Sequence, residues 1–131
     1  MSDRELVAVR LTYAANVLVA GTAGAVTLFG PPAAVQALFS GGTEPSPGLR
    51  VLGAFWLTVA ALSGLGLVRP RPVLAVLVVQ LGYKGAWLLS VAAPALIAGR
   101  SGDLPVGVAA FFAAWVVVLP LVIPWRAWLR G

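Results

Sequence analysis

Cysteine and histidine are both absent from the 131-residue sequence, and the only methionine is Met1. Without cysteine the chain has no disulfides, thiolate metal sites, iron–sulfur clusters or catalytic thiols. Without histidine it lacks the usual ligand of haem and copper and the commonest general base. We therefore expect no metal and no cofactor. An enzyme acting on a lipid or a quinone is the least favoured class of function.

Charge is also scarce, because 10% of the residues are charged whereas 60% are hydrophobic. Soluble domains carry roughly 25% charged residues, so a soluble chain of this composition could not cover its own core. The lipid bilayer is the solvent that fits. The net charge of +5 does not indicate nucleic-acid binding, because the basic residues are scattered and lie at the ends of apolar runs.

Four apolar runs divide the chain. Each has the roughly 20 residues that a helix needs to cross a hydrocarbon layer of about 30 Å, and backbone groups in lipid must pair within the helix. The predicted spans are residues 6–29, 49–68, 72–98 and 105–124. The first is too long for the apolar part of a signal peptide. The sequence thus predicts an all-α four-helix bundle, with residues 1–131 as a single transmembrane domain.

The arginines indicate the orientation of these helices. With four spans, one side of the membrane carries six arginines and the other side carries two. The six are Arg4, Arg10, Arg69, Arg71, Arg126 and Arg130, and the two are Arg50 and Arg100. This bias places both termini in the cytoplasm, together with the short turn 69–71 between the second and third helices. The predicted location is the inner (plasma) membrane of a bacterium, as a multi-pass protein.

Prolines mark the expected ends and bends of the helices. Pro94 in the third span predicts a stop or a bend, because proline cannot donate the helical hydrogen bond. The longest connection, residues 30–48, contains the segment PPAAVQALF, which begins with the residue favoured in the first turn of a helix. This segment fits a short helix in the membrane interface or a plain loop, and the sequence does not decide between them.

Small residues four positions apart recur in every span. The pairs are Ala20 and Gly24, Gly21 and Ala25, Ala60 and Gly64, Gly82 and Ala86, and Ala109 and Ala113. Helices in lipid associate through close backbone approach at such residues. We expect these pairs to lie at helix–helix contacts.

The C-terminal segment IPWRAWLRG has the composition of a membrane-interface anchor. Trp125, Arg126, Trp128 and Arg130 combine aromatic rings with guanidinium groups, both of which suit the headgroup level. A specific site for an anionic lipid is the alternative interpretation.

Lys84 is the most informative residue, because it lies near the middle of the third span. The ends of that helix are roughly 13–18 Å away at 1.5 Å per residue, and a lysine side chain reaches only about 6 Å. All four acidic residues lie at or beyond the ends of the spans. Lys84 therefore needs neutral acceptors, water, a lipid phosphate, a ligand anion or the loss of its proton.

The helical period predicts which side chains surround Lys84. Gln80 and Trp87 share its face of the third helix, and Tyr83 lies beside that face. Tyr13 and Asn16 lie close together on the first helix, where they supply acceptors to Lys84 if the two helices pack. The candidate ligand-binding residues are Lys84, Gln80, Tyr83, Trp87, Asn16 and Tyr13.

Two interpretations of this polar group compete. In the first, Gln80, Lys84 and Asn16 form a hydrogen-bonded knot that fixes the packing of the helices. In the second, Lys84 binds or helps to transport an anionic or carbonyl-bearing small molecule or lipid. A third possibility is an acidic residue of a partner protein. The alternative function is a non-catalytic accessory or scaffold subunit of a larger membrane complex, or a homo-oligomer.

Motifs in the second half of the chain carry a resemblance. QLGYKGAWLL, VAAPAL, FFAAW and IPW resemble segments of small four-helix bacterial integral membrane proteins that have no assigned activity. The resemblance implies a membrane four-helix fold and no particular function. The chain is similar to small multidrug exporters in length, but it lacks the first-span glutamate on which their coupling depends. The arginine bias also argues against the antiparallel dimers of small fluoride channels.

Overall fold

The computed structural model describes residues 1–40 and 44–131, which form helices joined by short turns. Neither of these two segments contains a strand, so the predicted all-α class is confirmed. The elements are α1 (Asp3–Phe29), α2 (Pro32–Leu38), α3 (Pro47–Val68), η1 (Arg71–Val73), α4 (Leu74–Trp87), η2 (Leu88–Ala92), α5 (Ala93–Ile97), η3 (Ser101–Asp103), α6 (Val106–Val122) and α7 (Trp125–Leu129).

Three helical segments are long and apolar enough to cross a membrane. They are Asp3–Phe29, Pro47–Val68 and Arg71–Ile97, and the last of them runs without a break through η1, α4, η2 and α5. A fourth apolar helix, α6, has 17 residues. The lengths and compositions of these helices support a membrane protein.

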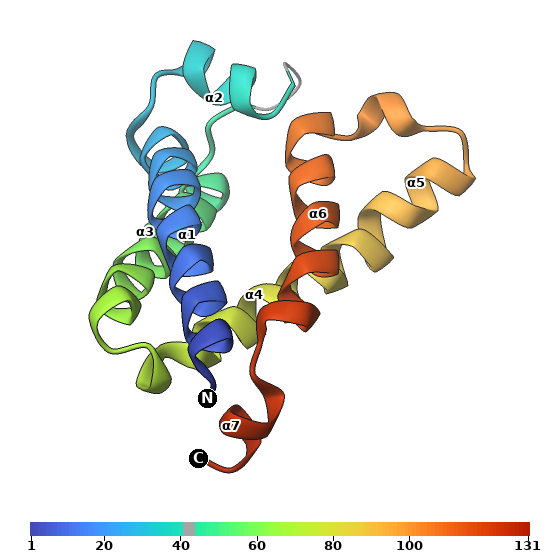
Figure 1. Ribbon diagram of the computed structural model, residues 1–131. Coiled ribbons are helices and arrows are strands. Elements are labelled where there is room, and N and C mark those ends of the chain that lie inside the picture. The colour runs from blue at the N-terminus through green and yellow to red at the C-terminus, as the bar shows by residue number, and fades with distance from the viewer. Residues whose placement is uncertain (41–43) are drawn as a thin grey trace.

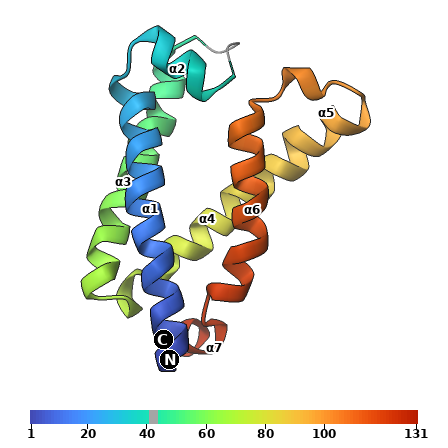
Figure 2. The same ribbon diagram turned by 45° about the horizontal axis from the view of Figure 1, so that its top comes forward.

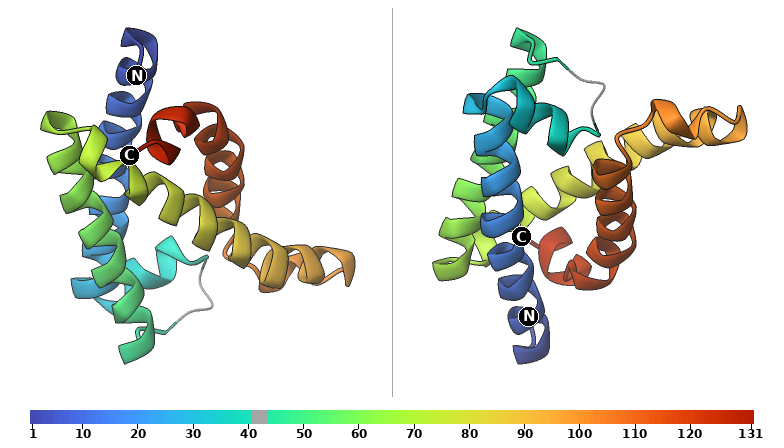
Figure 3. Two further views of the ribbon diagram at one scale, coloured as in Figure 1. Left: turned by 90° about the horizontal axis from the view of Figure 1, so that it is seen from below. Right: turned by 90° about the horizontal axis from the view of Figure 1, so that it is seen from above.

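The long helices are arranged as two pairs that meet at one end (Figure 1). α1 packs along α3, and α4 packs against α6. α4 and α5 run obliquely away from the α1–α3 pair, and α6 returns in front of them (Figure 2). Both termini lie at the end where the pairs meet, whereas α2 lies at the opposite end of α1 and α3 (Figures 1 and 3).

The contact between α1 and α3 is close because glycines face each other across it. A Cβ atom added to Gly53 would lie 2.5 Å from the backbone nitrogen of Leu28, and one on Gly24 would lie 2.8 Å from that of Leu57. Only residues without a side chain allow two helix backbones to approach this closely. The expected role of Gly24 at a helix contact is confirmed, and Gly53 contributes without having been among the predicted pairs.

The same expectation is wrong for Gly82 and Ala86. Both are exposed, and a Cβ atom on Gly82 would meet no described atom within 4 Å. The buried face of α4 instead carries Leu77, Gln80 and Lys84. Small residues four apart therefore form a contact only where the helix turns that face toward a neighbour.

Pro94 lies in a helix whose hydrogen-bonding pattern changes just before it. α4 passes into one π-helical turn, η2, and then into α5, which begins one residue before the proline. Such a turn accommodates the hydrogen bond that proline cannot donate. Of the two predicted alternatives at Pro94, the stop does not occur.

The segment that the sequence left open between helix and loop forms α2, with Pro31 as its N-cap and Pro32 as its first residue. Val35 and Phe39 are buried, and the Phe39 ring stacks on that of Trp56 in α3 with 6.1 Å between centroids. These contacts attach α2 to the end of the α1–α3 pair. Residues 41–43 of the connection 30–48 lie outside the described residues.

Candidate functional site

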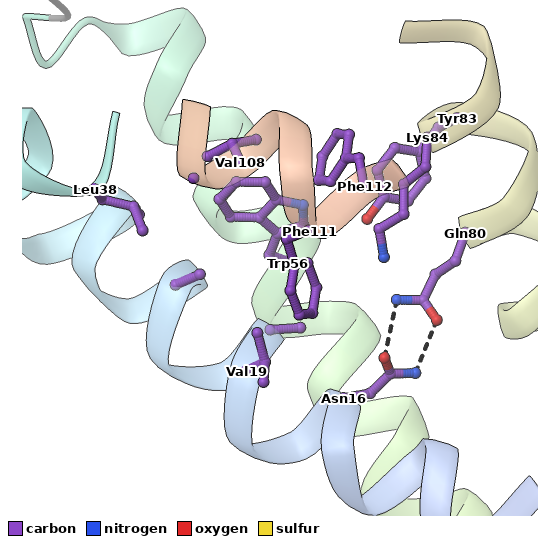
Figure 4. Close-up of a pocket in the computed structure, with 13 residues that line it drawn as sticks. Asn16, Val19, Leu38, Trp56, Gln80, Tyr83, Lys84, Val108, Phe111 and Phe112 are labelled. Carbon is purple, nitrogen blue, oxygen red and sulfur yellow. Dashed lines mark hydrogen bonds between the residues drawn. The ribbon is translucent and has the colours of Figure 1, made fainter. Parts of the chain in front are cut away.

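Asn16 lies at the centre of hydrogen bonds that join four helices. Its side-chain amide pairs with that of Gln80 in α4 through one bond donated by Asn16 (2.8 Å) and one donated by Gln80 (3.1 Å) (Figure 4). Asn16 Nδ2 also donates to Ser63 Oγ of α3 at 3.1 Å. Trp115 Nε1 of α6 donates to Asn16 Oδ1 at 3.3 Å. We call these four residues the Asn16 network.

The helical period brings these polar side chains into the interior. Tyr13 and Asn16 are three residues apart on the buried face of α1, and Leu77 and Gln80 are three apart on that of α4. A buried polar group without a partner is costly, above all in lipid. Asn16 and Gln80 are at most 2% exposed. The network therefore satisfies groups that water does not reach.

Lys84 lies one helical turn from Gln80, yet it takes no part in this network. The residue is 2% exposed, and its amino group makes no hydrogen bond or ion pair within residues 1–40 and 44–131. Instead, Nζ lies 5.3–5.8 Å from the ring centroids of Tyr83, Phe111, Phe112 and Trp115. Ring faces attract an ammonium at such distances, but they leave its directed N–H donors without oxygen acceptors.

The amino group of Lys84 points into a cavity of about 270 Å³ between α1, α2, α3, α4 and α6 (Figure 4). Asn16, Gln80 and Lys84 form what we call its polar end. The rest of the wall is apolar or aromatic and includes Ala20, Ala23, Leu38, Trp56, Val108, Phe111 and Phe112. A concave site with a few polar groups at one place and apolar walls elsewhere is typical of small-molecule binding.

The hydroxyl of Tyr83, the residue next to Lys84, is also unpaired within the described part of the chain. Its oxygen is buried and has no hydrogen-bond partner among the residues described. Edge-to-face contacts with Phe55 and Phe112, at 5.0 and 5.8 Å between centroids, fix the orientation of the ring. Most buried polar groups in proteins are hydrogen-bonded. Because this oxygen has almost no accessible surface, the cavity offers a bound molecule the ring of Tyr83 and not its hydroxyl.

Four of the six predicted site residues line the cavity, namely Asn16, Gln80, Tyr83 and Lys84. Tyr13 lies elsewhere, because its ring packs against Gly66 and its hydroxyl donates to the carbonyl oxygen of Pro70 at 3.0 Å. Trp87 is also outside the lining, although its ring contacts that of Phe112 at 5.4 Å between centroids.

The expectation that Asn16 and Tyr13 accept hydrogen bonds from Lys84 is wrong. The oxygen of Asn16 already accepts from Gln80 and Trp115, and the hydroxyl of Tyr13 donates to Pro70 at the turn between α3 and α4. The amide pair forms without the lysine. Lys84 is thereby left facing the cavity.

The aromatic side of the site could not be assigned from the sequence. Phe111, Phe112 and Trp115 of α6 surround the amino group of Lys84, and Trp56 of α3 completes the wall. The motif FFAAW could have indicated these residues, since positions 111, 112 and 115 fall on one side of a helix. Whether that side of α6 surrounds Lys84 depends on how α6 packs against α4, and the sequence of neither helix shows this.

The four predicted interface anchors lie on or beside α7. Trp125 Nε1 donates to the carbonyl oxygen of Pro120 at 2.9 Å, and the Trp125 ring contacts that of Trp128 with 6.1 Å between centroids. These contacts fold the short α7 back on the end of α6. The position of Trp125, Arg126, Trp128 and Arg130 at the membrane surface stays a prediction.

No protein-family model, curated protein or solved structure matches this chain. The cavity itself is therefore the basis for assigning a function. It presents the amino group of Lys84 beside apolar and aromatic walls.

Proposed function

We propose that the chain is a four-span protein of the bacterial inner membrane with both termini in the cytoplasm, its four apolar helices forming one bundle. The two termini lie at the same end of the molecule (Figure 1), which an even number of spans requires. α6, with 17 residues, would cover about 25 Å. A helix slightly shorter than the hydrocarbon layer is accommodated by local thinning of the bilayer.

Single cysteines introduced into this cysteine-free chain test the orientation. Ser101 and Gly131 are both exposed and lie at opposite ends of α6. We expect Ser101→Cys to react with a membrane-impermeant maleimide in intact cells, and Gly131→Cys to react only after permeabilisation. The reverse pattern would show that the arginine count misplaces the termini. Labelling of both in intact cells would contradict four spans.

We propose further that the protein binds a small anionic or carbonyl-bearing ligand in the cavity, with Lys84 as the main polar contact. The observation that supports this proposal is that the buried amino group of Lys84 has no hydrogen-bond partner among the described residues. A buried amino group costs free energy in lipid unless it has a partner, and the Asn16 network does not include it. An oxyanion or carbonyl oxygen in the cavity would accept from Lys84.

The size and walls of the cavity limit the ligand. Sites for drug-sized ligands span roughly 300–1,000 Å³, so a volume of about 270 Å³ fits a smaller molecule. Aromatic side chains such as Trp56, Phe111 and Phe112 favour an apolar or planar body. The proposed ligand is therefore a compact amphiphile whose oxygen-bearing group lies at the polar end. Transport of that ligand would be an additional step.

Replacing Lys84 by methionine tests the proposed site. We expect Lys84→Met to fold with an unchanged or higher melting temperature, because the desolvation cost of the amino group disappears. The wild type should carry a small molecule through purification that mass spectrometry detects, and Lys84→Met should lose it. Lys84→Arg should not restore binding fully, since a planar fork does not replace a compact ammonium.

Val79→Met is the matched control, because Val79 lies on α4 but is 50% exposed and outside the cavity lining. It should bind like the wild type. The site proposal fails if no ligand accompanies the wild-type protein and a strain carrying Lys84→Met shows no phenotype.

A scaffold role is the second candidate function. α5 extends away from the α1–α3 pair (Figure 3), and Leu96 and Ile97 at its end are 59% and 88% exposed. A neighbouring subunit, a second copy of the chain or lipid could cover such a projecting apolar helix. This role gains support if the Lys84 variant proves to be without effect.

A further inference from the structure

A second cavity lies at the end of the molecule where both termini meet. It shares no described lining residue with the cavity at Lys84. Its volume is about 880 Å³. It is formed by the start of α1, the start of α4 and the segment around α7. The residues that define its chemistry are Glu5, Arg71, Arg126, Trp128 and Arg130.

The charges in this second cavity are unbalanced. Arg71, Arg126 and Arg130 bring three guanidinium groups from two segments that are far apart in the sequence, whereas Glu5 supplies one acidic side chain among the described residues of the lining. That carboxylate already accepts from the backbone nitrogen of Ser2 at 2.7 Å. Arg126 and Arg130 are also four residues apart, a spacing at which like charges on a helix repel. The arrangement favours an anion that contacts several arginines at once.

The arginines of α7 are held over the cavity. The indole of Trp128 packs against the buried cluster that contains Val9, Leu74 and Ile123, and Trp125 is tied to the carbonyl oxygen of Pro120. These contacts fix α7 beside the start of α4. Arg126 and Arg130 therefore line the second cavity together with Arg71, all three being exposed.

The position of the second cavity along the membrane normal indicates which anion it binds. It lies at the ends of α1, α4 and α6 and is lined by Trp128, and tryptophan is enriched at the level of lipid headgroups. The commonest anion at that level is the phosphate of a lipid. Guanidinium groups bind phosphate through paired hydrogen bonds, and basic pockets between helices on the cytoplasmic side bind anionic headgroups.

We propose that the second cavity is a site for the headgroup of an anionic glycerophospholipid, with its phosphate bound by Arg71, Arg126 and Arg130. The proposal uses the membrane placement argued above and is independent of any ligand at Lys84. One lipid bound here links the N-terminal part of α1, the turn before α4 and α7. It therefore stabilises the end at which the two helix pairs meet.

The test is the binding of single lipids to the purified full chain, counted by native mass spectrometry. Phosphatidylglycerol and phosphatidylcholine with identical acyl chains are titrated separately. We expect the wild type to prefer phosphatidylglycerol. An arginine near an anionic headgroup changes affinity about fivefold. Arg126→Gln with Arg130→Gln should therefore weaken phosphatidylglycerol binding about 25-fold, and Arg71→Gln alone about fivefold.

The matched control removes two other arginines from the same end of the molecule. Arg4 and Arg10 are exposed on α1 and lie outside the second cavity, so Arg4→Gln with Arg10→Gln should weaken binding less than fivefold. An equal loss in both double variants, or no loss in Arg71→Gln, would overturn the proposed site. If excess inorganic phosphate displaced the lipid completely, the site would be one for the free anion and not for a lipid.

Discussion

We expect Gly53→Leu to lower the free energy of unfolding by about 3 kcal/mol or more, or to prevent folding. Any side chain at this position meets the backbone of α1, because a Cβ atom would lie 2.5 Å from the nitrogen of Leu28 and 2.8 Å from the carbonyl carbon of Thr27. Backbone atoms in a helix cannot move aside singly, so the two helices must separate. Overpacking of this kind commonly costs 1–3 kcal/mol where flexible side chains can adjust, and here they cannot. Thermal unfolding in detergent measures the effect.

Gly82→Leu is the control for the same substitution in a helix of the same protein. Gly82 has open space around its Cβ position, and leucine is the better helix former by about 0.8 kcal/mol. We expect this variant to be as stable as the wild type or slightly more stable. Equal melting temperatures for Gly53→Leu and Gly82→Leu would show that the close contact between α1 and α3 does not exist.

The second large effect is expected at Asn16. Asn16→Leu keeps the size of the side chain but removes all hydrogen bonds of the Asn16 network, which leaves the amide of Gln80 and the hydroxyl of Ser63 unpaired inside the protein. Hydrogen bonds between membrane helices average about 0.6 kcal/mol and reach about 1.7, and orphaned buried groups cost about 1–3 kcal/mol. We expect a loss of about 2–3 kcal/mol, measured by thermal or chemical unfolding in detergent.

A double variant tests the reason for that loss. Asn16→Leu combined with Gln80→Leu removes both members of the amide pair, and replacing both partners by apolar groups is close to neutral. The double variant should therefore be more stable than Asn16→Leu alone, with a coupling energy of about 1–2 kcal/mol. Simple additivity of the two losses would mean that the amide pair contributes nothing of its own.

These variants also separate structure from binding. The sequence allowed Asn16, Gln80 and Lys84 to form one knot, but the hydrogen bonds join Asn16 to Gln80, Ser63 and Trp115 and omit the lysine. Changes at Asn16 are therefore expected to alter mainly stability. Changes at Lys84 are expected to alter mainly the proposed binding, which makes the two interpretations distinguishable by experiment.

The sequence by itself predicted the long helices and indicated a membrane as their environment. The apolar runs 6–29 and 72–98 correspond to α1 and to the helix Arg71–Ile97, and the scarcity of charge indicated lipid as the solvent. These features depend on residues within one segment, because backbone pairing and transfer to lipid are local properties. Lys84 stood out for the same reason, since its distance from both helix ends follows from the helical rise.

Only the tertiary structure decided which faces of the helices meet. In lipid, the sequence of a helix that is apolar on all sides does not show which face is buried. Pairs of small residues with the same four-residue spacing therefore lie at a helix contact in one helix and on the outside of another. Gly24 lies in a tight contact whereas Gly82 faces outward. Tyr13 bonds to the turn at Pro70, and the rings that surround Lys84 come largely from α6, 27 or more positions further along the chain. Contacts of this kind depend on how each helix is rotated about its axis, which close packing between helices sets and hydrophobicity does not.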